Sequence, residues 1–213
     1  MDSLVTKIKN GFTLAEVLIT LVVIGVIAAL TIPNVINNMQ REELHSQFKK
    51  TISVTSQAVQ KMKIDYGDLI FDTENDTPKI FRDKFINYFS VSCKDNCIDA
   101  SKYKNYTNSV NASNAYFSNS FIAQDGAAYG FFKGDYSLYL YITVDINGLK
   151  GPNRWGYDVF TFYISGSDIK PCDNGIPGTS IRCSDSYPDL GSNGAGCTAK
   201  AIANANYFKN LPK

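Results

Sequence analysis

Three groups of residues in this 213-residue chain have types and spacings that could do chemistry. One carboxylate, Glu16, lies inside an otherwise uncharged run from Phe12 to Ile32. Oxygen-bearing side chains recur between Asp145 and Asp158, and they are of the kind that hard metal ions bind. Five cysteines follow the apolar run and could form disulfides or hold a metal ion.

Catalysis has few suitable residues in this sequence. The chain has one histidine, His45, which removes most triad and metal-hydrolase chemistries that use imidazole as a base or ligand. No histidine follows residue 64, where we expect the exported body to begin, so no nucleophile–histidine pair can form there. We therefore expect a protein that is not an enzyme.

Composition and charge exclude further classes. The apolar content of 44% is typical of a globular protein and excludes a disordered chain or a polytopic membrane protein. The 21 Lys and Arg nearly balance the 20 Asp and Glu, which leaves a formal charge of +1. No overall basic field is available to hold nucleic acid, so we expect no clear nucleic-acid binding.

The run from Phe12 to Ile32 predicts a membrane-spanning helix, because about 20 apolar residues span about 30 Å, the thickness of the hydrocarbon core. Lys7 and Lys9 precede it, which predicts a cytoplasmic leader and an exported C-terminal body. A cleaved secretory signal is the alternative, but its apolar core has only about 7–15 residues. This run is longer and continues past Pro33 in a helical pattern.

Glu16 is difficult to explain in a simple anchor, because a carboxylate in a spanning helix costs about 2.5–3.5 kcal/mol on insertion scales. A cut between Gly11 and Phe12 would create an α-ammonium group one helical turn away, on the same face. That ammonium could pair with Glu16 of the same subunit or, in a staggered bundle of parallel helices, with Glu16 of a neighbour.

The same residues resemble a known processing signature. Lys7-x-Lys9-x-Gly11, followed by Phe-Thr-Leu-x-Glu-Val-Leu-Ile-Thr and an apolar run ending Ile-Pro33, is similar to the prepilin cleavage and methylation signature of type IV pilins and type II secretion pseudopilins. The similarity extends from about Lys7 to Gln40.

The resemblance implies a role for each matching position. A membrane-embedded aspartyl prepilin peptidase would cut after Gly11 and methylate the new N-terminus at Phe12. Glu16 would pair with the N-terminus of a neighbouring subunit during assembly, and the helix would loosen between Gly25 and Pro33 in the filament.

The periodicity beyond Pro33 predicts one helix from about Thr13 to Ile64 that ends near Gly67, since Phe48, Ile52, Val59 and Met62 recur at helical spacing.

The expected organisation is a leader peptide at residues 1–11, a hydrophobic membrane and assembly half of the helix at 12–36, an amphipathic half at 37–64, and an exported α+β head at 65–213.

Two alternating runs, Leu138–Ile146 and Tyr157–Ile164, predict a β-hairpin with one buried face. We expect an α+β, type IV pilin-like fold in which the long helix packs against a small antiparallel sheet.

A short helix is expected around Ile80–Phe89, and a short helix or strand over Ala199–Phe208. Composition predicts a surface loop over Asp99–Ser120, whose tyrosines either form adhesive or subunit contacts or are partly buried against the sheet.

Between the two strands, hard oxygen ligands indicate a possible calcium site formed by Asp145, Asn147, Asn153 and Asp158. The segment resembles the Asp-x-Asn-Gly-x-x-Gly-Pro loop of many major pseudopilins, some of which hold calcium nearby. The alternative is that these Asp and Asn side chains cap turns through their own backbone, with no cofactor.

The five cysteines all follow the expected membrane helix, which is typical of disulfides formed in an oxidising exterior and predicts a stapled, loop-rich C-terminal region. Zinc is the alternative for the first two. Our predicted pairing is Cys93 with Cys97 and Cys172 with Cys183, which leaves one thiol unpaired or bridging subunits; the full set is Cys93, Cys97, Cys172, Cys183 and Cys197.

These observations predict a pilin or pseudopilin subunit of a type IV pilus-like filament, used for type II secretion or a related pilus. Its expected partners are other copies of itself and related pilins, prepilin peptidase, a membrane assembly platform and, before assembly, the lipid bilayer. The precursor would lie in the inner membrane as a single-pass protein with an exported body, and later in a periplasmic or cell-surface filament. The alternative function is a minor pilin at the filament tip that binds a surface, a substrate or DNA.

Overall fold

A computed structural model describes residues 13–67, 70–95, 97–133, 139–174, 176 and 180–211 of the chain. The predicted leader, Gly11, Phe12 and Leu138 lie outside the described residues. The chain divides into two compact units, residues 1–40 and 41–213, which are taken here in turn.

The first unit consists of the N-terminal part of helix α1, which runs from Leu14 to Tyr66. Among the described residues, α1 is the one helix that is long and apolar enough to cross a membrane, and its most apolar 18-residue window has a mean hydropathy of 2.6. None of that window is buried. Gly25 and Pro33 both lie inside the helix, which continues through them.

The second unit begins with the rest of α1, which ends where the sequence predicts. Gly67 has a φ of +84°, a left-handed conformation that favours glycine, and its N–H donates to Lys63 O at 3.0 Å. The helix predicted over Thr13–Ile64 is therefore confirmed as Leu14–Tyr66.

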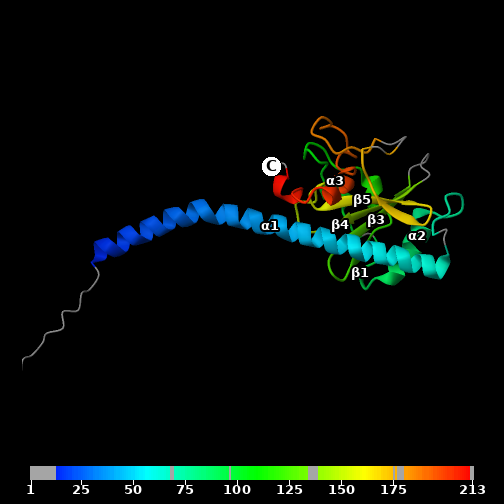
Figure 1. Ribbon diagram of the computed structural model, residues 1–213, viewed down its shortest axis with the longest axis horizontal. Helices are drawn as coiled ribbons and strands as arrows, with labels where there is room; N and C mark the ends of the chain where they lie inside the picture. Colours follow the sequence, from blue (N-terminus) through cyan, green and yellow to red (C-terminus); the bar gives the residue numbers. More distant parts are fainter. Residues whose placement is uncertain are drawn as a thin grey trace, which may run out of the picture. The chain divides into compact units, whose positions relative to one another are not determined.

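A six-stranded antiparallel sheet forms the centre of this unit (Figure 1). The strands follow each other in chain order from one edge to the other: β1 (Val91–Cys93), β2 (Phe121–Ala123), β3 (Ala128–Lys133), β4 (Leu140–Asp145), β5 (Val159–Ser165) and β6 (Asp168–Pro171). The predicted hairpin is confirmed as β4 and β5, which pair from Leu140↔Ile164 to Asp145↔Val159. The other four strands were not predicted individually, because they are short or lack an alternating pattern.

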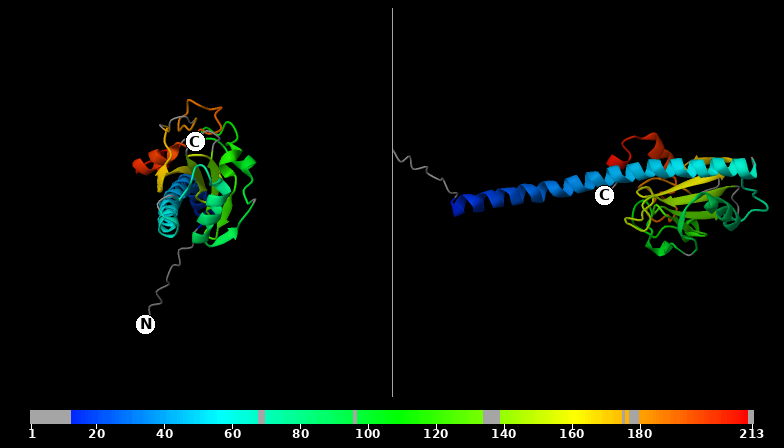
Figure 2. Two further views of the ribbon diagram at one scale, coloured as in Figure 1. Left: turned by 90° about the vertical axis from the view of Figure 1, so that its right-hand side faces the viewer. Right: turned by 90° about the horizontal axis from the view of Figure 1, so that it is seen from below.

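One face of the sheet packs against the body part of α1 (Figure 2). Phe48 of the helix lies 4.4 Å from Phe160 of β5, measured between ring centroids. Val59 and Met62 join the same buried cluster and expose 2% and 0% of their surface. Each fully buried side chain of this kind contributes about 1.5–3 kcal/mol, so this interface holds the helix and sheet together.

The opposite face of the sheet is covered by loops, which we call the loop layer: residues 97–120 and 180–196, with the short helices η2 (Ala100–Lys102) and η3 (Asn114–Phe117). Tyr103, Tyr106 and Tyr116 are buried in the body, as one of the two sequence alternatives proposed. The segment Asp99–Ser120 has many exposed residues, as expected for a surface loop, and its Tyr103, Tyr116 and Phe117 cover the second face of the sheet.

The remaining elements add residues to the same core as α1. Helix α2 (Pro78–Phe85) and the turn η1 (Ile86–Tyr88) account for the predicted short helix. The C-terminal region forms α3 (Cys197–Ala203) and η4 (Phe208–Asn210). Within η4, Phe208 packs against both Phe48 and Phe160, so the C-terminal segment completes the helix-side core.

Candidate functional site

The N-terminus of α1 is closed by a reciprocal pair of hydrogen bonds between Thr13 and Glu16. The Thr13 N–H and hydroxyl both donate to Glu16 Oε2 at 2.8 Å, and the Glu16 N–H donates to Thr13 Oγ1 at 3.3 Å. This is a capping box, in which two polar groups of the first turn satisfy each other. The Thr-x-x-Glu spacing in the sequence is the signal that could have predicted this pair.

The capping box gives Glu16 a partner that does not depend on processing. The predicted pairing of Glu16 with the N-terminus at Phe12 falls on a residue outside the described part of the chain. Glu16 itself is exposed, so its carboxylate is open to a second partner from another molecule.

The surface that follows the capping box is apolar. Large hydrophobic side chains of the first unit are each at least 45% exposed, and they include Leu14, Val17, Leu18, Ile19, Leu21, Val22, Val23, Ile24, Val26, Ile27, Leu30, Ile32, Val35, Ile36 and Met39. Soluble monomers do not expose a continuous apolar surface of this extent, so it requires lipid or protein to cover it.

A second group of functional candidates lies in the segment between β4 and β5, which we call the 145–158 segment. Asp145 and Asp158 are both 0% exposed. Asp145 Oδ2 accepts a hydrogen bond from the Tyr103 hydroxyl at 2.8 Å. The two oxygens of Asp158 accept from the N–H groups of Asn153 and Arg154 at 2.8 and 2.7 Å. The turn-capping role that the sequence allowed is thus present.

The electrostatics of this carboxylate pair are unfavourable. Burial raises the pKa of both Asp145 and Asp158, and the neighbouring charge of Asp158 raises the pKa of Asp145 further. Within the described residues neither carboxylate has an ion pair, because the Arg154 guanidinium donates instead to Tyr106 O at 2.9 and 2.6 Å. Hydrogen bonds from Tyr103, Asn153 and Arg154 offset part of the cost of burying these charges, and a proton or a positive charge beside the pair would offset more of it.

Two amide oxygens of the same segment have no partner. Asn147 Oδ1 and Asn153 Oδ1 are buried atoms that accept no hydrogen bond in the structure. Together with the two carboxylates they form a set of hard oxygen donors of the type calcium binds. No group of three or more His, Cys, Asp or Glu side chains that could hold a metal occurs among the described residues, so any ion here would need these amide oxygens.

The cysteines pair differently from the prediction at one position. Cys93 and Cys97 are bonded as predicted, which answers the zinc alternative for them. Cys183 pairs with Cys197, so the predicted bond between Cys172 and Cys183 was wrong. The Gly194 N–H donates to Arg182 O at 2.6 Å and brings the two bonded cysteines together, whereas Cys172 follows strand β6 and is free and buried under the loop layer.

Comparison with known families identifies the N-terminal segment. Residues 6–32 match the family model described as the prokaryotic N-terminal methylation motif, which is the type IV pilin and pseudopilin signature. The match includes Gly11, Phe12 and Glu16, and it implies processing by prepilin peptidase and assembly with other pilins. No curated protein and no solved structure matches the chain.

Proposed function

We propose that this protein is a structural subunit of a type IV pilus-like filament, cut after Gly11 and polymerised through the N-terminal part of α1. The observation that supports this most directly is the methylation motif at residues 6–32, which overlaps the N-terminal part of α1, where the large apolar side chains before residue 41 are exposed. Such a surface suits lipid before assembly and neighbouring helices afterwards.

In this proposal Glu16 exchanges its partner. In the precursor its carboxylate is held by Thr13, and in the filament it pairs with the methylated N-terminus of a neighbouring subunit. An ion pair in an apolar, water-poor bundle is strong and directional, so it sets the register between subunits.

Glu16→Gln is expected to leave the body folded and to abolish filaments, because the neutral amide cannot form an ion pair with an ammonium. Thr13→Val is the matched control, since it removes the capping hydroxyl and keeps the charge of Glu16. Filament yield by electron microscopy should fall much further for Glu16→Gln than for Thr13→Val. Equal losses would mean that Glu16 acts through the capping box alone.

Processing is tested separately by mass spectrometry of the N-terminus. The expected product begins with a methylated Phe12, and a chain that keeps Met1 in cells with prepilin peptidase would contradict the proposal.

We propose that the filament serves type II secretion or a related pilus. The precursor would lie in the inner membrane, and the filament would lie in the periplasm or at the cell surface. The adhesin alternative rested on the tyrosine-rich loop, and Tyr103, Tyr106 and Tyr116 are buried, so they give it no support. Abundance in purified filaments distinguishes the two, since a tip protein is scarce and a main subunit is abundant.

We also propose that the 145–158 segment holds a structural calcium ion through Asp145, Asn147, Asn153 and Asp158. The two amide oxygens without partners support this, because they are buried at an energetic cost that a cation would offset. Calcium supplies two positive charges beside the buried carboxylates.

Isothermal titration of the full chain in detergent with calcium chloride should show one binding site. Asn147→Ala should weaken that binding, because it removes one of the oxygens without a partner. Lys150→Ala, an exposed position in the same segment, is the matched control and should not weaken it. Absence of any heat of binding for the wild-type chain would contradict a calcium site.

A further inference from the structure

The 145–158 segment is bonded to the first loop of the loop layer at several points. Besides the hydrogen bond from the Tyr103 hydroxyl to Asp145, the Lys104 N–H donates to Asn153 O at 2.9 Å. The Trp155 N–H donates back to Lys104 O at 3.0 Å. The chain from Tyr103 to Lys104 is therefore tied to both ends of the proposed calcium segment.

The same contacts continue from that loop to the second one. The Arg154 guanidinium binds Tyr106 O, and the Tyr106 N–H donates to Asn193 O at 2.8 Å. Gly194 then approaches so closely that a Cβ there would lie 2.3 Å from Trp155 Cβ. Its φ of +107° is also a conformation that side chains rarely adopt, so glycine is required.

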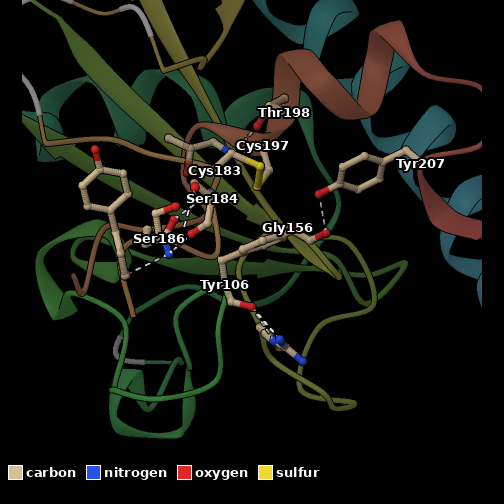
Figure 3. The surroundings of a disulfide bond; sticks show 12 residues. Tyr106, Gly156, Cys183, Ser184, Ser186, Cys197, Thr198 and Tyr207 are labelled. Atoms are coloured by element: carbon tan, nitrogen blue, oxygen red, sulfur yellow. Dashed lines mark hydrogen bonds between the residues drawn. A yellow bond between two sulfur atoms is a disulfide. The ribbon is translucent and has the colours of Figure 1, made fainter. Parts of the chain in front are cut away.

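Cys183 of the second loop is bonded to Cys197, the first residue of α3, and Gly156 of the 145–158 segment lies close to this disulfide (Figure 3). A Cβ on Gly156 would lie 2.9 Å from Cys197 Sγ, which shows how close the backbone is to the sulfur. The Tyr207 hydroxyl donates to Gly156 O at 2.7 Å, so Tyr207 also packs beside this part of the segment. This disulfide is shielded by the segment that we propose holds calcium.

Burial distinguishes the two disulfides of the protein. Cys183 and Cys197 expose 6% and 0% of their surface, whereas Cys93 and Cys97 are both half-buried. A thiolate must reach a sulfur atom to reduce a disulfide, so Cys183–Cys197 can be reduced only when the segments packed around it, which include Gly156 and Tyr207, move apart. Cys93–Cys97 has no such requirement.

We propose that a calcium ion in the 145–158 segment locks the loop layer and thereby controls how fast the Cys183–Cys197 disulfide can be reduced. This inference rests on the calcium site proposed above. The ion would fix Asp145 and Asp158 together, and these residues hold Tyr103 and Arg154 in the positions that close the two loops. An ion that binds only the closed state lowers the ratio of open to closed molecules by the factor 1 + c/Kd, where c is the free calcium concentration.

The test is reduction of the full chain in detergent by dithiothreitol, with calcium chloride or with EDTA. One dithiothreitol thiolate attacks a sulfur of the disulfide and forms a mixed disulfide, and its second thiol then displaces the protein sulfur. The products are two protein thiols and cyclic oxidised dithiothreitol. Alkylation followed by mass spectrometry reports the rate at each cysteine, and titration calorimetry on the same sample reports calcium binding.

The expected result is that reduction of Cys183–Cys197 slows about tenfold at a calcium concentration ten times the Kd. Reduction of Cys93–Cys97 should be unchanged, which makes it the internal control. Asn147→Ala should need a higher calcium concentration for the same protection, and Lys150→Ala should behave as the wild type.

Two results would overturn the inference, and they have different meanings. If calcium binds and the reduction rate of Cys183–Cys197 does not change, or if both disulfides are protected equally, the loop layer is not locked by the ion although the calcium site stands. If no calcium binds, the calcium proposal itself fails and the inference fails with it.

Discussion

Thr13 changes the role that can be assigned to Glu16, because it gives the carboxylate a hydrogen-bond partner in the same helical turn. A carboxylate in an apolar run suggests an unpaired charge that awaits a distant partner, but the structure gives it a local one at 2.8 Å. The capping box satisfies donors of the first helical turn before any other subunit is present. Glu16 is therefore stable in the single chain while it remains accessible for assembly.

His45 offers a residue-level prediction, because it is the one histidine of the chain and its ring lies stacked on Phe208 at 5.2 Å between centroids. Burial lowers its pKa, and the charges of Lys49 and Lys209 lower it further. Because the pKa is lower in the folded state, His45 makes its full contribution to stability at pH values above its unfolded-state pKa of about 6.5. As the pH falls below this value, the unfolded chain takes up the proton first, and the contribution is lost.

Proton NMR should therefore give His45 a pKa below about 6.5, read from a single imidazole signal. Phe208→Leu should move the pKa back toward its ordinary value, because the ring is less shielded from water. A wild-type pKa at or above the ordinary value would contradict the stacked geometry.

Helix α1 has an exposed apolar surface in its first part and a buried one in its second part. The neighbouring elements determine which part is covered. Beyond residue 40, Phe48, Val59 and Met62 are buried against the sheet. Before residue 41, apolar side chains of the same kinds are exposed. A helical period predicts which side chains share a face, but the partner that covers the face comes from elsewhere in the chain.

Phe48→Ala should destabilise the body by about 3–5 kcal/mol, because it removes a buried ring that contacts both Phe160 and Phe208. Ile64→Ala on the same helix is the matched control: Ile64 is 82% exposed, so its loss should stay within about 0.5 kcal/mol. Urea unfolding of the full chain in detergent measures both. Similar losses for the two variants would mean that Phe48 is not part of the core.

At the level of the whole molecule, the buried core and the exposed apolar surface are separated in the chain. Within the part of the chain that the structure describes, the buried core residues lie between residues 48 and 211, and the exposed apolar run lies between residues 14 and 39. The near-zero net charge of +1 adds no long-range attraction to nucleic acid. The division into a unit that needs a partner and a unit with its own core suits the filament subunit that we propose.

A chain that starts at Arg41 is therefore expected to fold and to remain monomeric without detergent, since it keeps every core residue and loses the exposed apolar run. Near-ultraviolet circular dichroism and size-exclusion chromatography check this, with the full chain in detergent as the reference. Loss of the aromatic dichroism signal would show that the body depends on residues before Arg41.

Local patterns in the sequence were enough to predict the long helix, its end at Gly67, the β4–β5 hairpin, the processing motif and the Cys93–Cys97 bond. Each depends on residues that are close together in the chain, where periodicity, turn chemistry and short loops act directly. The Thr13–Glu16 capping box is equally local, and it could have been predicted from its spacing.

Only the tertiary structure decided the features that join distant segments. It buried the tyrosine-rich loop as a second layer of the sheet, paired Cys183 with Cys197 instead of Cys172, and left the amide oxygens of Asn147 and Asn153 without partners. The physical reason is that these outcomes depend on which loops pack together. Packing is a sum of many weak contacts between residues far apart in the chain, and no local pattern records it.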